Sequence, residues 1–270
     1  MRLCMFTPRD LGLARGWPGV IEGDVVYQLA AQTLQAFFTG GGNTRRHAEY
    51  ALADVELRPP VLHPPSVRDF YAFEQHVRTA RASRGQDVPP EWYELPVFYF
   101  SNPAAIYGPE DEIPYPLDTN ELDYELEVAA IVGAEGRIGG FTVMNDWSAR
   151  DLQRAEMRVG LGPAKGKDFA TSLGPIVVTP DEFGGTTGTM TARVNGEERS
   201  LGELADMYHS WDAIVARAAR NTHLRAGDVL GSGTVGTGCI FEHGDGRWLR
   251  RGDVVELEVE GIGVLRNRIV

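Results

Sequence analysis

Apolar and charged residues alternate in the stretch LDYELEV at residues 122–128. The apolar side chains occupy the even positions and three carboxylates occupy the odd ones. This period of two predicts a β-strand with Glu125 and Glu127 on one face and their Cα atoms about 7 Å apart. A hard divalent cation between the two carboxylates would offset their repulsion. The alternative is a solvated polar face of an antiparallel sheet.

A second strand is predicted by the apolar run at 141–144, which ends beside a third carboxylate, Asp146. The sequence SARD at 148–151 has the S-x-x-D spacing of a helix start, so we expect a helix from its serine or one residue earlier. On that helix Arg150 and Gln153 are three positions apart and share a face. Arg150 then lies near Asp146, or pairs with an acidic neighbour on the helix surface.

From residue 66 an apolar stripe at positions 70, 73, 77 and 80 predicts a helix over 66–80. Asp69 and His76 are seven residues apart, so they share a face of this helix, about 10.5 Å apart if it is unbroken. Taken alone, a histidine in this setting is most often a surface or interface residue. The polar segment 83–91 follows, either as a mobile lid or as an ordered loop.

The rest of the chain reads as short strands with few helices. Further strands are expected at residues 1–6, 189–194, 228–233, 254–259 and 264–270, with a hairpin at 19–29 and helices at 29–38 and 211–219. Four prolines between residues 59 and 65 mark a boundary, because proline stiffens linkers and stops helices. We therefore expect a small domain at 1–58 and a larger one at 59–270.

Composition supports an α+β, mainly β fold class. The chain has 270 residues, of which 43% are hydrophobic, enough to bury one large core. It contains 32 glycines, about 12% against a usual 7%, which favours turns and short strands over a helical bundle.

Charge and cysteine usage narrow the partners and the compartment. A net charge of -12 and a pI near 5.0 argue against a nucleic-acid partner, which would need a basic stripe. Two cysteines are too few for a disulfide framework. No uncharged apolar run approaches 18 residues, and the first residues are too short an apolar run for a signal peptide. We expect a cytoplasmic protein without a membrane partner.

Five motifs carry a resemblance to a known family. They are LDYELE at 122–127, MNDWSARDLQ at 144–153, LGPAKGKDFATSLGP at 161–175, GDVLGSGTVG at 227–236 and EGIGVLRNRIV at 260–270. Together they resemble the fumarylacetoacetate hydrolase (FAH) superfamily over nearly the whole chain, apart from a shortened N-terminal part. The resemblance implies a rolled mixed β-sheet domain preceded by a small α/β unit, assembled as a homodimer.

The same resemblance implies a metal site. Its expected ligands and neighbours are Asp69, Glu125, Glu127, Asp146, Lys167 and Thr171. The expected cation is Mg²⁺ or Ca²⁺, with Mn²⁺ as a further possibility, and no organic cofactor is expected. Thr171 is expected near a second ion.

The resemblance also assigns catalytic and substrate-binding residues. The catalytic group is His76 as general base, Glu242 to orient it, and Lys167. The substrate-binding group is Tyr71, Tyr99, Arg150, Gln153 and Thr234. Two alternatives stay open at this point: Tyr99 as a packing residue of an aromatic cluster, and Lys167 as a structural partner of Asp168.

These roles predict a metal-dependent hydrolase that cleaves a C–C bond in a 1,3-dicarbonyl acid, such as fumarylacetoacetate or an acylpyruvate of aromatic catabolism. A carbon leaving group departs readily only as an enolate, which a divalent ion stabilises, and His76 would activate water. The alternatives are an isomerase or decarboxylase of a 2-oxo or 2-hydroxydienoic acid, and a non-catalytic metal-binding paralogue. The resemblance associates the seven-residue interval from Asp69 to His76 with fumarylacetoacetate cleavage, so hydrolysis is the preferred expectation.

Overall fold

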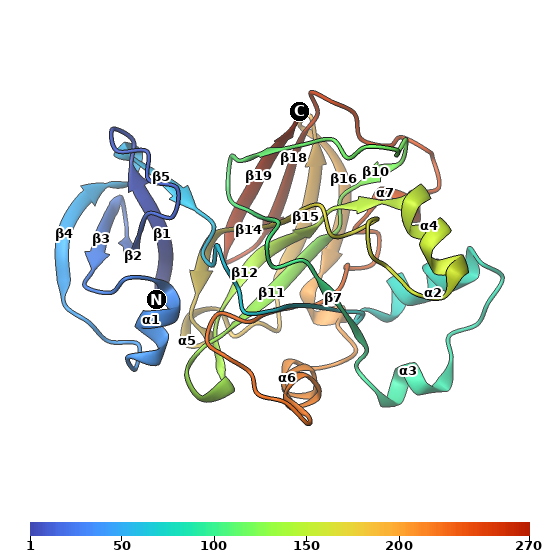
Figure 1. The fold of residues 1–270 in the computed structure, drawn as a ribbon, viewed down its shortest axis with the longest axis horizontal. Coiled ribbons are helices and arrows are strands. Elements are labelled where there is room, and N and C mark those ends of the chain that lie inside the picture. Colours follow the sequence, from blue (N-terminus) through green and yellow to red (C-terminus); the bar gives the residue numbers. More distant parts are fainter.

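The computed structural model describes all 270 residues, which form mainly short strands (Figure 1). The helices are α1 (Leu34–Thr39), α2 (Glu74–Ala82), α3 (Pro90–Glu94), α4 (Arg150–Val159), α5 (Pro180–Phe183), α6 (Trp211–Ala219) and α7 (Ile240–His243), with 3₁₀ turns η1 (Leu52–Asp54), η2 (Ala134–Gly136) and η3 (Leu204–Asp206). No helix has the length and apolar character that crossing a lipid bilayer would require.

Twelve strands form one mixed sheet, in the order β4-β3-β2-β1-β14-β12-β11-β17-β6-β7, with β5 paired to β1 and β8 to β14. Their bounds are β1 (Arg2–Pro8), β2 (Trp17–Glu22), β3 (Val25–Leu29), β4 (Arg46–Ala51), β5 (Val55–Arg58), β6 (Val67–Phe70), β7 (Phe98–Ser101), β8 (Ile106–Tyr107), β11 (Leu126–Val132), β12 (Ile138–Asp146), β14 (Thr171–Val178) and β17 (Val229–Gly231).

A second sheet of five strands has the order β16-β15-β18-β19-β9, and β10 pairs with β13 in a two-stranded ribbon. Their bounds are β9 (Glu112–Ile113), β10 (Leu122–Asp123), β13 (Ser148–Ala149), β15 (Thr189–Val194), β16 (Glu197–Glu203), β18 (Val254–Val259) and β19 (Gly263–Ile269). The mainly β, α+β class expected from the sequence is confirmed.

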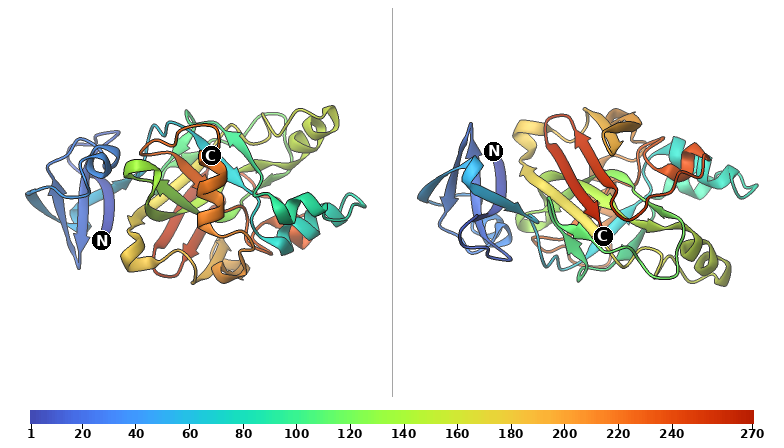
Figure 2. Two further views of the ribbon diagram at one scale, coloured as in Figure 1. Left: turned by 90° about the horizontal axis from the view of Figure 1, so that it is seen from below. Right: turned by 90° about the horizontal axis from the view of Figure 1, so that it is seen from above.

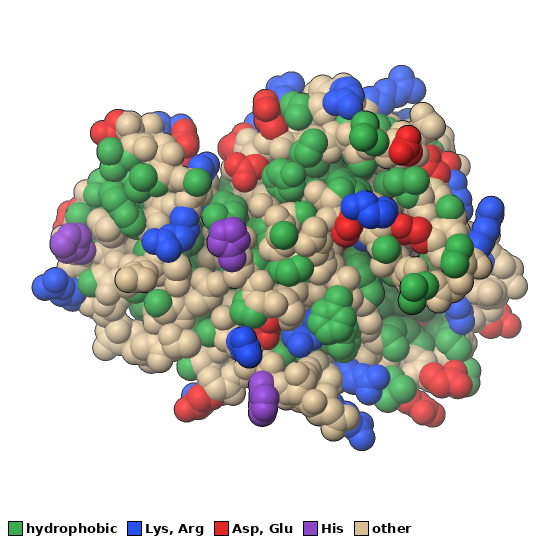
Figure 3. All heavy atoms as spheres, in the orientation of Figure 1, with side chains coloured by type: hydrophobic (Ala, Val, Ile, Leu, Met, Phe, Trp, Pro, Cys, Tyr) green, Lys and Arg blue, Asp and Glu red, His purple; other side chains and the backbone are tan.

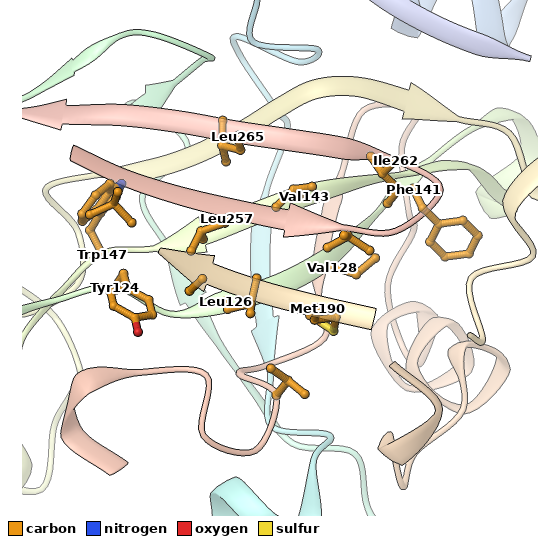
Figure 4. Packing of buried hydrophobic residues seen from close by; sticks show 14 of the residues in the cluster. Tyr124, Leu126, Val128, Phe141, Val143, Trp147, Met190, Leu257, Ile262 and Leu265 are labelled. Atoms are coloured by element: carbon orange, nitrogen blue, oxygen red, sulfur yellow. The ribbon is translucent and has the colours of Figure 1, made fainter. Parts of the chain in front are cut away.

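The main core lies between the two sheets. Leu126 and Val128 of β11 and Val143 of β12 face Leu257 of β18 and Met190 of β15 in this core (Figure 4). Every residue of β11 is buried. Because a strand sends alternate side chains to opposite faces, the other face of β11 must also be covered.

A second core, which we call the outer core, covers that opposite face. It contains Ala129 and Ile131 of β11, Met144 of β12 and the α1 residues Leu34 and Phe38. The outer core also includes strand residues of the N-terminal part, among them Leu3 and Met5. Residues of the first 58 therefore cover part of the sheet on the face that carries the odd-numbered side chains of β11.

The N-terminal strands stand as a lobe at one end of the molecule, and α2, α3 and α4 lie at the other (Figures 1 and 2). Strand β1 joins the lobe to the large sheet through two pairs of residues with β14, Arg2 with Val178 and Leu3 with Val177. The sheet is thus continuous across the expected boundary, and the division at residue 58 stays a prediction. On the visible face, acidic and basic side chains are interspersed (Figure 3).

Several expected elements are confirmed with their bounds, namely the strands at 189–194 and 254–259 and the helix at 211–219. The helix predicted over 66–80 is wrong in its first part, because residues 67–70 form β6 and the helix begins only at Glu74. All four residues of β6 are buried, and a short, fully buried strand cannot be told from a helix by its periodicity.

Other elements also differ from the prediction, three of them near the carboxylates or in the N-terminal part. The strand expected at 122–128 is interrupted at Tyr124 and Glu125, between β10 and β11. The helix expected at 29–38 begins at Leu34, where the Thr33 side chain accepts a hydrogen bond from the Ala36 backbone N–H. Helix α4 begins at Arg150, because Ser148 belongs to β13 and its hydroxyl donates to the Asp146 carbonyl.

Candidate active site

Four buried carboxylates converge at one end of the large sheet. Asp69 lies on β6, Glu127 on β11, Asp146 at the end of β12, and Glu125 directly before β11. Each offers an oxygen, and these four oxygens lie within 4.8 Å of one another. The structure thus brings together the four carboxylates expected from the sequence. It excludes a solvated polar face, because Glu125 and Glu127 are both buried.

Strand pairing explains why the carboxylates meet. Asp69 and Glu127 have the same parity along their strands as outer-core residues, so they point to the same face of the sheet. Strand β17 runs between β6 and β11, with Gly231 opposite Asp69 on one side and Ala129 on the other. A Cβ atom at Gly231 would lie 2.6 Å from Asp69 Oδ1 and 2.9 Å from Glu127 Oε2. A side chain at this position would therefore force both carboxylates to move from their present positions.

Two cations reach the cluster from outside the sheet. The Lys167 ammonium donates to Asp146 Oδ2 at 2.5 Å and also to Glu125. The Arg150 guanidinium donates from Nη2 to Glu125 Oε1 at 2.8 Å. Four carboxylates therefore face two basic groups. The excess negative charge is concentrated on Asp69 and Glu127, which neither cation contacts.

The pKa values follow this division. Burial raises the pKa of Asp69 and of Glu127 well above the ordinary range, and nearby carboxylates raise both further. Burial also acts on Glu125, but Lys167 and Arg150 outweigh it, so its pKa is lowered. Burial opposes the charge of Lys167, yet Asp146 and Glu125 stabilise the ammonium and raise its pKa.

The donor set fits a divalent cation. Oδ1 of Asp69, Oε1 of Glu127 and Oδ1 of Asp146 are buried and have no hydrogen-bond partner. Buried polar atoms are nearly always paired, so three unpaired carboxylate oxygens in one cluster point to a missing positive partner. An all-oxygen set of this kind suits Mg²⁺, Ca²⁺ or Mn²⁺.

Two other expected site residues support the cluster from its edge. The Tyr99 hydroxyl donates to Asp146 Oδ2, so this side chain holds a carboxylate and does more than fill an aromatic cluster. Thr171 is the cross-strand neighbour of Asp146 in the β12–β14 pair. Its hydroxyl lies 3.5 Å from that of Ser101, and its expected role at a second ion stays a prediction.

His76 and Glu242 come together from α2 and α7. His76 Nδ1 lies 3.2 Å from Glu242 Oε2, and both side chains are buried. The geometry of this contact does not make a hydrogen bond, so His76 Nδ1 has no hydrogen-bond partner. The Tyr71 ring meets the His76 ring edge to face, with centroids 5.3 Å apart. The pair sits as expected from the sequence, although Asp69 and His76 do not share a helix.

One pocket of about 940 Å³ connects these groups. Its walls include Asp69, Glu125, Lys167, His76, Tyr71, Tyr99, Gln153 and Thr234. Helix α2 with the segment after it lines one side and α4 the other, and these two projections are visible in Figure 2. The mouth also carries Arg84 and Arg158, so the pocket offers positive charge to an anionic ligand.

Arg150 lines the pocket, but its guanidinium is engaged by the protein. Its Nε donates to Asp123 Oδ2 at 2.8 Å, its Nη2 to Glu125 and its Nη1 to Gln153 Oε1 at 3.2 Å. The surface ion pair considered from the sequence is wrong, because Arg150 is buried. These partners favour positioning of Glu125 over direct binding of a substrate carboxylate.

The loop that carries Lys165, Lys167 and Asp168 shows which lysine pairs with Asp168. Asp168 pairs with Lys165 at 2.8 Å, on the exposed side of the loop. Lys167 points inward and is buried among the carboxylates. A purely structural pair between Lys167 and Asp168 is therefore excluded.

Some residues of the site were not expected from the sequence. Asp123 accepts from Arg150 and from the backbone N–H groups of Ile240 and Phe241, tying α7 to the cluster. Its alternation with Glu125 was the signal that could have revealed it. Gly231 carried no such signal, because its role depends on two carboxylates from other strands.

Comparisons with known proteins agree with this geometry. The sequence pattern of the family described as "Fumarylacetoacetate (FAA) hydrolase C-terminal" matches residues 66–270. The mitochondrial oxaloacetate tautomerase FAHD2A of Homo sapiens is 30% identical, with 100% of this chain and 92% of that protein covered. Its counterpart in Rattus norvegicus is 32% identical over the same shares.

Solved structures with the same fold are also similar in sequence. A 5-carboxymethyl-2-hydroxymuconate delta-isomerase from Mycobacterium smegmatis is 29% identical, with a TM-score of 0.78 over 100% of this chain and 99% of that one. A fumarylacetoacetate hydrolase from Exiguobacterium antarcticum is 28% identical, with a TM-score of 0.80 over the same shares. The family match and the full-length relatives lead to one conclusion: the chain belongs to the fumarylacetoacetate hydrolase family.

Proposed function

We propose that the protein is a metal-dependent enzyme that moves a proton within a small 2-oxo acid, as a keto–enol tautomerase or an isomerase. The observation that carries this proposal is that one pocket is lined by Asp69 and Glu125 of the carboxylate cluster and by His76 of the His76–Glu242 pair. Three of the four similar proteins named above support the reaction class, since two are tautomerases of oxaloacetate and one is an isomerase, while the fourth is a hydrolase. This replaces hydrolysis, the reaction expected from the sequence, as the first candidate.

Asp69, Glu125, Glu127 and Asp146 would hold the cation, with Mg²⁺, Ca²⁺ or Mn²⁺ as the candidates. When bound, the cation polarises the 2-oxo group and offsets negative charge on an enolate oxygen. Lys167 adds a second positive charge at the same place, because its ammonium lies against Asp146 and Glu125. Arg150 keeps Glu125 ionised and fixed.

His76 is the group that would carry the proton. Its Nδ1 faces Glu242, so Nε2 is the nitrogen left for a substrate in the pocket. Nε2 would take a proton from the carbon next to the 2-oxo group, and Glu242 would stabilise the imidazolium by charge. The imidazolium would then return the proton to the substrate, either to the enolate oxygen or to another carbon atom.

Hydrolysis of a C–C bond is the second candidate, and the size of the pocket favours it. About 940 Å³ is the volume of a drug-sized ligand site, far larger than a four-carbon acid needs. In that reaction His76 would take its proton from water, which attacks the distal carbonyl. The leaving carbon would depart as the same enolate.

The two reactions are separated by their products. The purified protein is supplied with Mg²⁺ and either the enol form of oxaloacetate or an acylpyruvate, and the ultraviolet absorbance of the enol is followed with product analysis. A tautomerase speeds the decay of the enol without carbon loss, whereas a hydrolase releases pyruvate and a second acid from the acylpyruvate.

His76→Ala is the decisive variant, because loss of a general base typically costs 10²–10⁴-fold in rate. A rate that stays at the level of Mg²⁺ alone with both substrates would refute the proposal. An unchanged rate in His76→Ala would refute the role of His76.

A further inference from the structure

A second group of metal-ligating side chains lies beside the carboxylate cluster. His76, Cys239 and Glu242 each offer one ligand atom, and these atoms lie within 4.8 Å of one another. We propose that these three residues form a binding site for a soft divalent cation of the zinc class, and that occupation of this site switches the enzyme off. The binding step stands apart from the proposed function, while the inhibition rests on it.

Two distances within this trio match a tetrahedral zinc site. Zinc lies about 2.0–2.1 Å from histidine nitrogen and carboxylate oxygen and about 2.3 Å from thiolate sulfur. In a tetrahedron these bond lengths place the nitrogen about 3.3 Å from the oxygen and the sulfur about 3.6 Å from the oxygen. Here His76 Nδ1 is 3.2 Å from Glu242 Oε2, and Cys239 Sγ is 3.6 Å from the same oxygen.

The trio also holds unused lone pairs. His76 Nδ1 and Glu242 Oε1 are buried and have no hydrogen-bond partner. The Cys239 side chain is fully buried, and its one polar contact is with Glu242. Three potential ligands that are buried together without strong partners of their own can accept a cation with the loss of one weak hydrogen bond, from the Cys239 thiol to Glu242.

The two neighbouring sites differ in chemistry. The cluster of Asp69, Glu125, Glu127 and Asp146 offers only oxygen, which suits Mg²⁺, whereas the trio offers nitrogen, sulfur and oxygen, which suit Zn²⁺. On binding, the Cys239 thiol would lose its proton to solvent and become a thiolate ligand. A cation would reach the trio from the pocket, because His76 lines that pocket.

Occupation has a direct consequence for His76. A histidine whose Nδ1 is bound to a cation and whose charge partner Glu242 is also engaged cannot become an imidazolium. It would therefore lose its capacity to take a proton from the substrate. The expected result is inhibition of the Mg²⁺-loaded enzyme by zinc without displacement of Mg²⁺.

Binding is tested by calorimetric titration of Zn²⁺ into the full-length protein held in excess Mg²⁺. Cys239→Ala removes the sulfur ligand, and Cys4→Ala is the matched control, since Cys4 is equally buried but lies on β1. We expect one zinc equivalent in the wild type and in Cys4→Ala, and at least roughly tenfold weaker binding in Cys239→Ala. Cd²⁺ should give a thiolate-to-metal ultraviolet band that only Cys239→Ala lacks.

Equal zinc affinity in the wild type and Cys239→Ala, or a missing Cd²⁺ band, would overturn the site. If Cys239→Ala does not fold, as judged by circular dichroism, Glu242→Gln provides the same comparison. In the activity arm, zinc should inhibit the wild type at concentrations at least roughly tenfold lower than it inhibits Cys239→Ala. Equal inhibition would overturn the inhibitory role of this site, because zinc would then act elsewhere, for example at the carboxylates. Absence of any turnover would refute the proposed function and leave the binding result to decide the site.

Discussion

Two carboxylate oxygens, one from Asp69 and one from Glu127, approach β17 at Gly231, where a Cβ would lie under 3.0 Å from each. The site therefore depends on a residue that donates nothing to a ligand. This explains why reading the ligands from the sequence describes the site incompletely. Backbone space between strands is as necessary as the carboxylates themselves.

Gly231→Ala tests this dependence. The added methyl group would push the two carboxylates apart, so we expect the affinity for Mg²⁺ to fall by roughly 10–100-fold, the usual effect of disturbing groups behind metal ligands. Calorimetric titration measures it. Gly40→Ala, at the end of α1, is the control, because its nearest clash is a mild 3.1 Å with the Ala36 carbonyl. Wild-type affinity in Gly231→Ala would contradict the role given to β17.

The raised pKa values of Asp69 and Glu127 give a dependence on pH. Burial and neighbouring carboxylates hold protons on the folded protein that the unfolded chain releases above about pH 4. Because the pKa values of both groups are raised in the folded protein, the metal-free protein loses stability as pH rises from about 4, where the unfolded chain releases these protons, to the raised pKa values of the folded state. A divalent cation must displace those protons, so its affinity should rise by up to about tenfold per pH unit for each proton released.

Thermal melting with chelator or with Mg²⁺, from about pH 5 to about pH 8, measures both effects. As pH rises, the melting temperature of the metal-free protein should fall, and the increase in melting temperature on addition of Mg²⁺ should become larger. Glu127→Gln, which cannot ionise, should flatten the fall. A metal-free melting temperature that rises steadily over this range would contradict the raised pKa values.

At the scale of elements, the sequence predicted best where an element has half-buried as well as buried positions. Strand β18 alternates between half-buried and buried residues, β15 has half-buried residues at two of its six positions, and the bounds of both strands match the prediction. Strand β6 is buried on both faces, so its apolar residues could not be distinguished from the apolar stripe of α2, and the two elements were predicted as one helix. Ser148 has the spacing of a helix cap, but it pairs instead with Asp123 of β10 and therefore belongs to a strand. The periodicity of a short segment does not reveal which distant segment it pairs with.

Helix α4 carries a row of three arginines, of which the sequence analysis identified only Arg150. Arg150, Arg154 and Arg158 are four residues apart and lie on one side of the helix, lining the pocket. Arg150 is tied to Asp123 and Glu125, and Arg154 forms a two-pronged pair with Glu121. Arg158 has no ion-pair partner, so it is the cation of this helix left to attract an anionic substrate.

Arg158→Gln should therefore weaken the capture of substrate. A single exposed charge contributes up to about 1 kcal/mol, so we expect kcat/KM for an oxo acid to fall by about two- to fivefold at low salt, with kcat unchanged. The difference should vanish at high ionic strength, because salt screens the attraction. Arg137→Gln, on an exposed turn paired with Glu135, is the control. A loss that persists in high salt would argue against steering.

At the scale of the whole molecule, the N-terminal lobe and the catalytic part share the outer core. Leu34, Phe37 and Phe38 of α1 pack in the same cluster as Ile131 of β11 and Met144 of β12. The methyl end of Met144 in turn lies 2.8 Å from the position of a Cβ at Gly231, next to the carboxylates. Packing of the lobe is therefore continuous with the floor of the carboxylate cluster, which the proline cluster alone did not indicate.

Phe38→Ala measures that continuity. Removing a buried phenylalanine typically costs about 3–5 kcal/mol, and here the cavity would open between the lobe and the large sheet. Because the core is shared, calorimetry should record a single unfolding transition at lower temperature, together with weaker Mg²⁺ binding. Leu161→Ala, whose side chain is 85% exposed, should leave both unchanged. Two separate transitions, with the upper one and the Mg²⁺ affinity both unaltered, would show instead that the lobe folds as an independent domain.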